Sequence, residues 1–161
     1  RSILSAKLVR SVTPNFERRP GCGRCEHRIK WAVDEPYSPE ARLLLVEWRT
    51  ARRQMIAPTL FFFEITNALS KRVRRGQLTL ADARAGLQYL LEVGPIVLQS
   101  DAIHRRGLEL AARFGLTAAY DAHYLALAES HQCECWTADE RLWNSVKREL
   151  NWVRWLGESA R

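Results

Sequence analysis

The chain has 161 residues, of which 47% are hydrophobic and 27% are charged, a composition typical of one globular domain rather than of a disordered segment. No apolar run approaches the roughly 20 residues of a membrane-spanning helix, and no long apolar core follows the basic opening residues as it would in a secretory signal, so we expect a cytoplasmic protein. The formal net charge of +7 favours partners that carry phosphate, although many proteins with no such partner are also basic.

From residue 38 onward, helical patterns alternate with short apolar strands. The pattern predicts helices at 38–53, 59–75, 79–93, 100–114, 116–130 and 139–150, and strands at 54–58, 95–99, 133–137 and 151–156. Expected caps are Thr79 and either Ser100 or Asp101 at helix starts, and Gly76, Gly94 and Gly115 at helix ends. Strands that are apolar throughout belong to a parallel sheet covered on both faces, so we predict an α/β fold with helices flanking a parallel sheet.

Residues 1–28 do not fit this pattern. They contain no apolar run of strand length and no helical stripe, so we predict an atypical N-terminal segment at 1–28 and one domain at 29–161. Cys22, Cys25 and His27 allow a zinc site as an alternative. The second cysteine pair, Cys133 and Cys135, lacks the usual ligand spacing, and we expect it to be buried in a strand.

Three acidic residues follow the predicted strands. Glu64 lies one turn into the helix after strand 54–58, Asp121 lies in the first turn of its helix, and Asp139 directly follows strand 133–137. Ligands of such sheets bind outside the carboxyl ends of the strands, and three converging carboxylates would suit Mg²⁺ or Mn²⁺. Asn67 and Thr137 could support this site. The alternative is structural, with Asp139 as a helix N-cap and Asp121 complementing a helix dipole.

A group of cations closes the helix that carries Glu64. We call Lys71, Arg72, Arg74 and Arg75 the basic cluster. The basic cluster is a candidate for binding an RNA backbone, but cations at a helix C-terminus also complement the dipole of that helix.

Three motifs resemble one family when they are taken together. They are A-P-x-L-x-x-x-E-x-x-N-A-L at 57–69, Y-D-A-x-Y-L-A-L-A at 120–128 and T-A-D-E-R-L at 137–142, followed by VRWLG at 153–157. They resemble the PIN-domain ribonucleases, in particular the VapC toxins of prokaryotic toxin–antitoxin modules. The resemblance covers the chain from about residue 29 to its end.

The resemblance implies a three-layer α/β/α fold and a metal-dependent endoribonuclease that hydrolyses RNA phosphodiester bonds. It also implies metal-site acids at Glu64, Asp121 and Asp139 with Thr137 nearby, Mg²⁺ or Mn²⁺ as cofactor, a cognate antitoxin and a homodimer.

The chain departs from the family pattern at its first strand. The family has an Asp at the end of that strand, and the corresponding position here is Arg24. Glu26 could replace that acid, or residues 1–28 could come from a shifted reading frame or a gene fragment. The alternative function is therefore a catalytically inactive PIN-like module that binds antitoxin or RNA.

Overall fold

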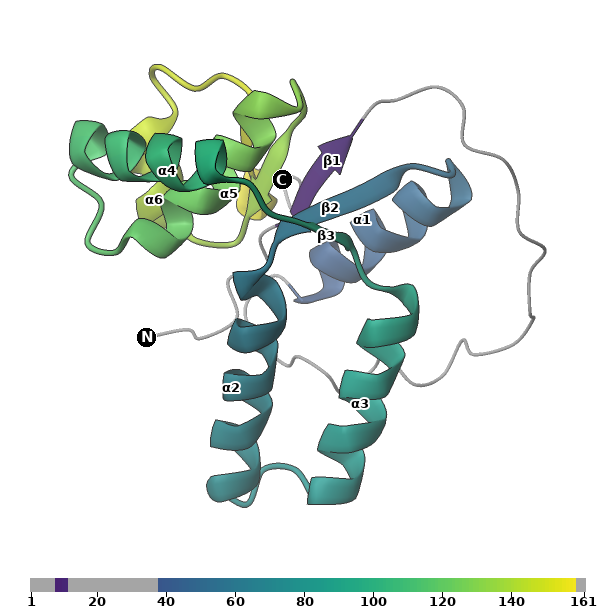
Figure 1. Ribbon diagram of the computed structural model, residues 1–161. Coiled ribbons are helices and arrows are strands. Elements are labelled where there is room, and N and C mark those ends of the chain that lie inside the picture. The colour runs from purple at the N-terminus through teal and green to yellow at the C-terminus, as the bar shows by residue number, and fades with distance from the viewer. Residues whose placement is uncertain (1–7, 12–37, 159–161) are drawn as a thin grey trace.

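The computed structural model describes residues 8–11 and 38–158 of the chain (Figure 1). In chain order the elements are β1 (Leu8–Ser11), α1 (Ser38–Thr50), β2 (Gln54–Pro58), α2 (Leu60–Arg74), α3 (Leu80–Val93), β3 (Ile96–Leu98), α4 (Asp101–Phe114), α5 (Ala119–Ser130), β4 (Cys135–Thr137), α6 (Glu140–Val146), β5 (Val153–Trp155) and the 3₁₀ turn Leu156–Glu158. The predicted order of helices and strands from residue 38 onward is confirmed. No helix in these ranges is both long and apolar enough to cross a membrane.

The strands form one sheet in the order β3-β2-β1-β4-β5. The outer pairs β2–β3 and β4–β5 are parallel, whereas β1 pairs antiparallel with both β2 and β4. The four strands β2 to β5 therefore run in the same direction and end at the same edge of the sheet. This geometry confirms the α/β class and gives the predicted acids a common edge to approach.

The central strand differs from the sequence-based expectation. β1 lies within the first 28 residues, where we predicted no strand, and its orientation makes the sheet mixed rather than purely parallel. The segment LVRS is only four residues long, too short to give a periodic signal. Its backbone nevertheless pairs with both neighbours, so it fills the position between the two parallel pairs and leaves neither of them with an open inner edge.

Helices cover both faces of the sheet, as β4 illustrates. Cys135 and Thr137 are fully buried in the core shared with α5, while Trp136 between them points to the opposite face. There its ring contacts Trp48 of α1 edge-to-face, with ring centroids 6.2 Å apart. Figure 1 correspondingly shows α4, α5 and α6 together on one side of the strands and α1 on the other, which gives the three-layer arrangement.

Helices α2 and α3 extend away from the sheet as an antiparallel hairpin (Figure 1). They pack through a small apolar cluster of their own, formed by Ile65, Leu69 and Ala83. The hydroxyl oxygen of Thr79 caps α3 by accepting from the backbone N–H of Asp82 at 3.1 Å. The hairpin thus carries the C-terminal end of α2 away from the sheet edge, while the N-terminal end stays there.

The boundaries of α4 follow the predicted capping residues. Ser100, rather than Asp101, is the N-cap, and its side chain accepts from the N–H of Ile103 at 3.3 Å. Gly115 ends the helix at a φ of +59°, a left-handed conformation that glycine adopts at little cost. Helix α6 ends at Val146, four residues before the predicted boundary at 150.

Candidate functional site

The three predicted acids lie beside the edge at which β2 to β5 end. Glu64 lies one turn into α2, which begins directly after β2. Asp139 follows the last residue of β4 by two positions, and Asp121 lies in the first turn of α5. All three side chains are half-buried, so each is partly desolvated yet accessible from solvent.

Glu64 is tied to α5 by a short hydrogen bond. The hydroxyl of Tyr124 donates to Glu64 Oε2 at 2.6 Å. Tyr124 is 1% exposed, and its burial, together with the negative charge of Glu64, raises the pKa of its hydroxyl, which therefore stays protonated and available as a donor. A charge-assisted bond of this length fixes the Glu64 carboxylate against α5.

Tyr124 was not among the predicted site residues, although the sequence contains a signal for it. Tyr124 and Asp121 are three positions apart on α5, a spacing that places both side chains on the same face of the helix. The bond from Tyr124 therefore holds Glu64 toward the face of α5 on which Asp121 lies.

Asp139 has the capping role that was the structural alternative to metal binding, and its local geometry is fixed by backbone bonds. Its Oδ1 accepts from the N–H of Arg141 at 2.9 Å and of Leu142 at 3.1 Å, which makes Asp139 the N-cap of α6. The hydroxyl of Thr137, which is fully buried, accepts from the backbone N–H of Asp139 at 3.0 Å. Both cap bonds are accepted by the same carboxylate oxygen, so the carboxylate is held in one orientation while it caps the helix.

The donor chemistry of these residues fits a hard divalent cation, because all three are carboxylates. In the described ranges no three His, Cys, Asp or Glu side chains lie close enough together to form a metal cage. Mg²⁺ does not require such a cage, since it is usually held by one or two carboxylates together with waters and substrate phosphates. The agreement of this site with a divalent cation therefore rests on its three carboxylate donors and on their position at one edge of the sheet.

The predicted supporting residue Asn67 is exposed on α2 and makes no hydrogen bond to Glu64. The residue that donates a hydrogen bond to Glu64 is Tyr124.

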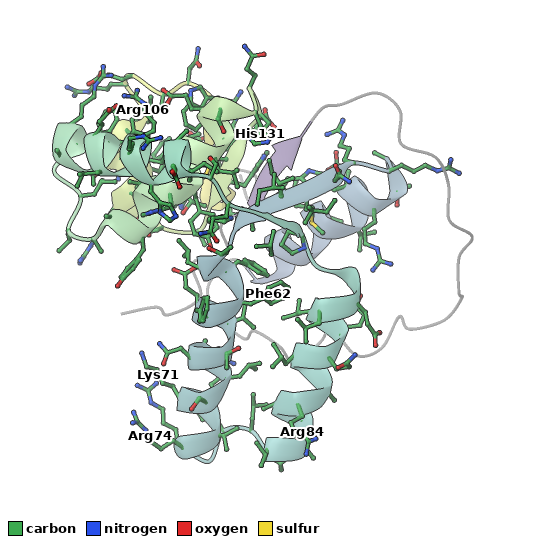
Figure 2. The ribbon with its side chains drawn as sticks, viewed as in Figure 1. Phe62, Lys71, Arg74, Arg84, Arg106 and His131 are labelled. Atoms are coloured by element: carbon green, nitrogen blue, oxygen red, sulfur yellow. The ribbon has the colours of Figure 1, made fainter. Side chains whose placement is uncertain are left out.

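The basic cluster lies further along α2. Figure 2 shows Lys71 and Arg74 pointing outward from the distal half of α2, with Arg84 on the adjacent end of α3. Arg74 is ten residues beyond Glu64, which corresponds to about 15 Å along a helix.

Two further sequence-based expectations concern the cysteines and the first strand. Cys133 and Cys135 are both buried, as expected. The zinc alternative at Cys22, Cys25 and His27 lies outside the described residues, as do Arg24 and Glu26. The strand that occupies the centre of the sheet, Leu8–Ser11, contains no acidic residue.

Comparison with known proteins identifies the family. The model of the PIN domain matches residues 31–148, most of the chain, and the chain belongs to the PIN-domain family. Similar proteins include a VapC ribonuclease of Mycobacterium bovis and the ribonuclease VapC9 of Mycobacterium tuberculosis. Each is 35% identical to this chain over 96 residues, which cover 56% of this chain and 73% of the relative.

Proposed function

We propose that this protein is a VapC-like endoribonuclease that hydrolyses RNA phosphodiester bonds with the help of Mg²⁺ or Mn²⁺. The observation that carries the proposal is the hydrogen bond from Tyr124 to Glu64, because it holds an acid of α2 against the helix that carries Asp121. Membership of the PIN-domain family and the likeness to proteins named VapC ribonuclease support the same activity.

In this proposal one or two of Glu64, Asp121 and Asp139 bind the metal ion directly, and the remaining acid reaches it through water. When bound, such an ion supplies positive charge to the scissile phosphate and activates water as the nucleophile. The protein contributes orientation: Tyr124 fixes Glu64, and the first backbone N–H groups of α6 fix Asp139. Thr137 steadies the turn between β4 and Asp139 by accepting from its backbone N–H.

The basic cluster binds a part of the RNA backbone that lies at a distance from the reacting phosphate. Five cations lie between residues 71 and 84, namely the basic cluster and Arg84, against the single carboxylate of Asp82. This end of the hairpin therefore offers a concentrated positive charge to a phosphate chain that extends along α2 from the acids.

The same proposal includes a cognate antitoxin, a homodimer and a cytoplasmic location. Co-purification tests the complex with an antitoxin, and measurement of the mass in solution tests the homodimer.

RNA cleavage tests the proposal. A mixed pool of structured RNAs is incubated with the protein in Mn²⁺, in Mg²⁺ and in EDTA, and compared with the variant Asp121→Asn. The matched control is Asp82→Asn, the same chemical change in the first turn of α3 at the far end of the hairpin. We expect metal-dependent cleavage that Asp121→Asn abolishes and Asp82→Asn retains. Cleavage that is equal in all three proteins would mean that Asp121 is only a first-turn acid.

One observation favours a second candidate, a PIN-like module without activity that binds RNA or an antitoxin. The central strand carries no carboxylate and presents its first residue, not its last, at the edge where the other strands end. An inactive module would bind RNA in a gel-shift assay at full strength yet leave it intact in Mn²⁺. The active protein cuts the same RNA in Mn²⁺ and only binds it in EDTA.

A further inference from the structure

A cavity of about 170 Å³ opens next to the start of α5, and Tyr120, the neighbour of Asp121 in the sequence, lines it. It lies where β2 and β3 end and where α2, α4 and α5 begin, so it shares the edge of the sheet on which the acids lie. Its apolar lining comes mainly from Pro58, Leu60, Leu98 and Ile103, and its polar lining includes Ser100, His104 and His123. Tyr120 completes the wall on the side of α5.

The size and the lining of the cavity limit what it can receive. Sites for drug-sized ligands have volumes of roughly 300 to 1,000 Å³, so this cavity has room for a single ring system and not for a whole nucleotide. Pro58 and Ile103 are buried and offer no partner for a charge. A phosphate group placed against them would lose its hydration without compensation. The flat, largely apolar face of a heterocyclic ring suits these walls better.

The two histidines form a directed chain of hydrogen bonds. His123 Nδ1 lies 2.7 Å from the carbonyl oxygen of Ala119, which can only accept, so this nitrogen carries the hydrogen. In the neutral ring His123 Nε2 is then an acceptor, and it receives the hydrogen of His104 Nδ1 at 3.0 Å. His104 Nε2 takes no part in this series of hydrogen bonds. His104 is exposed at the cavity wall, so this nitrogen can meet the polar edge of a ligand.

Tyr120 joins the cavity to the predicted reaction centre. It is 65% exposed, and it directly precedes Asp121. Exposed aromatic rings bind single-stranded nucleic acids by stacking on their bases. Adjacent residues on α5 thus offer a ring for a base and an acid for the metal that serves the neighbouring phosphate.

We propose that this cavity receives one unstacked nucleobase of the RNA substrate, adjacent to the scissile phosphate. The base stacks on Tyr120, and its polar edge meets His104, whose orientation is fixed through His123. The inference rests on the proposed ribonuclease function, because it names the part of the substrate that the site binds. It makes Tyr120 and His104 specificity-determining residues, and it predicts a preference for the base at one position beside the cut.

Binding without cleavage provides the test. The chain is titrated in EDTA with a labelled, short single-stranded RNA of mixed sequence, and then with a series in which one position at a time is abasic. We expect one position at which removal of the base weakens binding about tenfold, the usual contribution of one stacked base. Equal tolerance of an abasic site at every position would overturn the proposal.

Variants of Tyr120 separate stacking from folding. Tyr120 is largely exposed, so its replacement does not threaten the core. Tyr120→Phe keeps the ring and should bind like the unmodified protein, whereas Tyr120→Leu should bind the intact RNA about tenfold more weakly and lose its sensitivity to the abasic position. Equal affinities of the two variants would contradict the proposal.

Histidine ring signals in NMR spectra give an independent readout. At saturating RNA, His104 and His123 should shift, while His131, which follows the other end of α5, should not. A cavity that instead receives a side chain of a protein partner would leave both signals unmoved. The cleavage assay separates the two proposals. If one base position affects binding but the RNA is not cut in Mn²⁺, a base binds in the cavity and the protein is not a nuclease. If the RNA is cut but no base position affects binding, the protein is a nuclease and the cavity does not bind a base.

Discussion

Replacing Tyr124 with Phe removes one hydroxyl and leaves the packing of the ring unchanged. The lost bond is 2.6 Å long and has a carboxylate as its acceptor. Hydrogen bonds to charged groups contribute about 1.5–3 kcal/mol, and Glu64 is only half-buried, so water can replace part of the loss. We therefore expect Tyr124→Phe to lower the free energy of unfolding by about 1.5 kcal/mol. In a domain of this size this corresponds to a decrease in Tm of about 3–6 °C.

Urea unfolding of a double-mutant cycle with Glu64→Ala measures this contribution. Without Glu64 this bond does not exist, so Tyr124→Phe should then cost clearly less than it does in the unmodified protein. Tyr89→Phe is the matched control, since its hydroxyl accepts from Arg49 at an exposed site and should contribute less than about 0.5 kcal/mol. Equal costs of Tyr124→Phe with and without Glu64 would refute the coupling.

The remaining predictions concern a cap, the basic cluster and an ion pair. Asp139→Ala should lose about 1 kcal/mol of stability in urea because α6 loses its cap, and Asp139→Asn should keep most of it, yet both should abolish cleavage. Changing the whole basic cluster to Gln should reduce the slope of log affinity for single-stranded RNA against log salt by roughly 2–3, and an unchanged slope would exclude contact with phosphates. Arg106, labelled in Figure 2, donates from Nε to Glu129 Oε2 at 2.6 Å, and this bond lowers the pKa of Glu129. The bond therefore stabilises the protein fully at pH values above the ordinary pKa of a carboxyl group. This stabilisation is lost as the pH falls through the lowered pKa of Glu129. Because both side chains are 35% exposed, Glu129→Gln should cost only about 0.5–1 kcal/mol at pH 7 and less at pH 3, as thermal unfolding would record.

The sequence predicted the edge of the sheet at which the acids lie, because that inference needs only local signals. Strand ends and helix starts around Glu64, Asp121 and Asp139 are marked by short-range patterns, and parallel strands end at one edge. The Tyr124–Glu64 bond joins residues 60 positions apart, so no local pattern reports it. Only the helical spacing between Asp121 and Tyr124 offered a hint.

The central strand and the cavity were missed for related reasons. β1 has four residues, and its position depends on pairing with two distant strands, not on its own pattern. The histidines of the cavity are 19 positions apart on separate helices and meet only when α4 packs on α5. Short strands and sites assembled from packed helices are set by tertiary structure, which local propensity does not encode.

Binding of Mn²⁺, followed by electron paramagnetic resonance, tests most directly the central claim that Glu64, Asp121 and Asp139 share one metal site. The unmodified protein should bind Mn²⁺, and Glu64→Gln, Asp121→Asn and Asp139→Asn should each weaken that binding about tenfold or more, while Asp82→Asn leaves it unchanged. Failure of the unmodified protein to bind Mn²⁺, or equal binding by all of these variants, would contradict the claim.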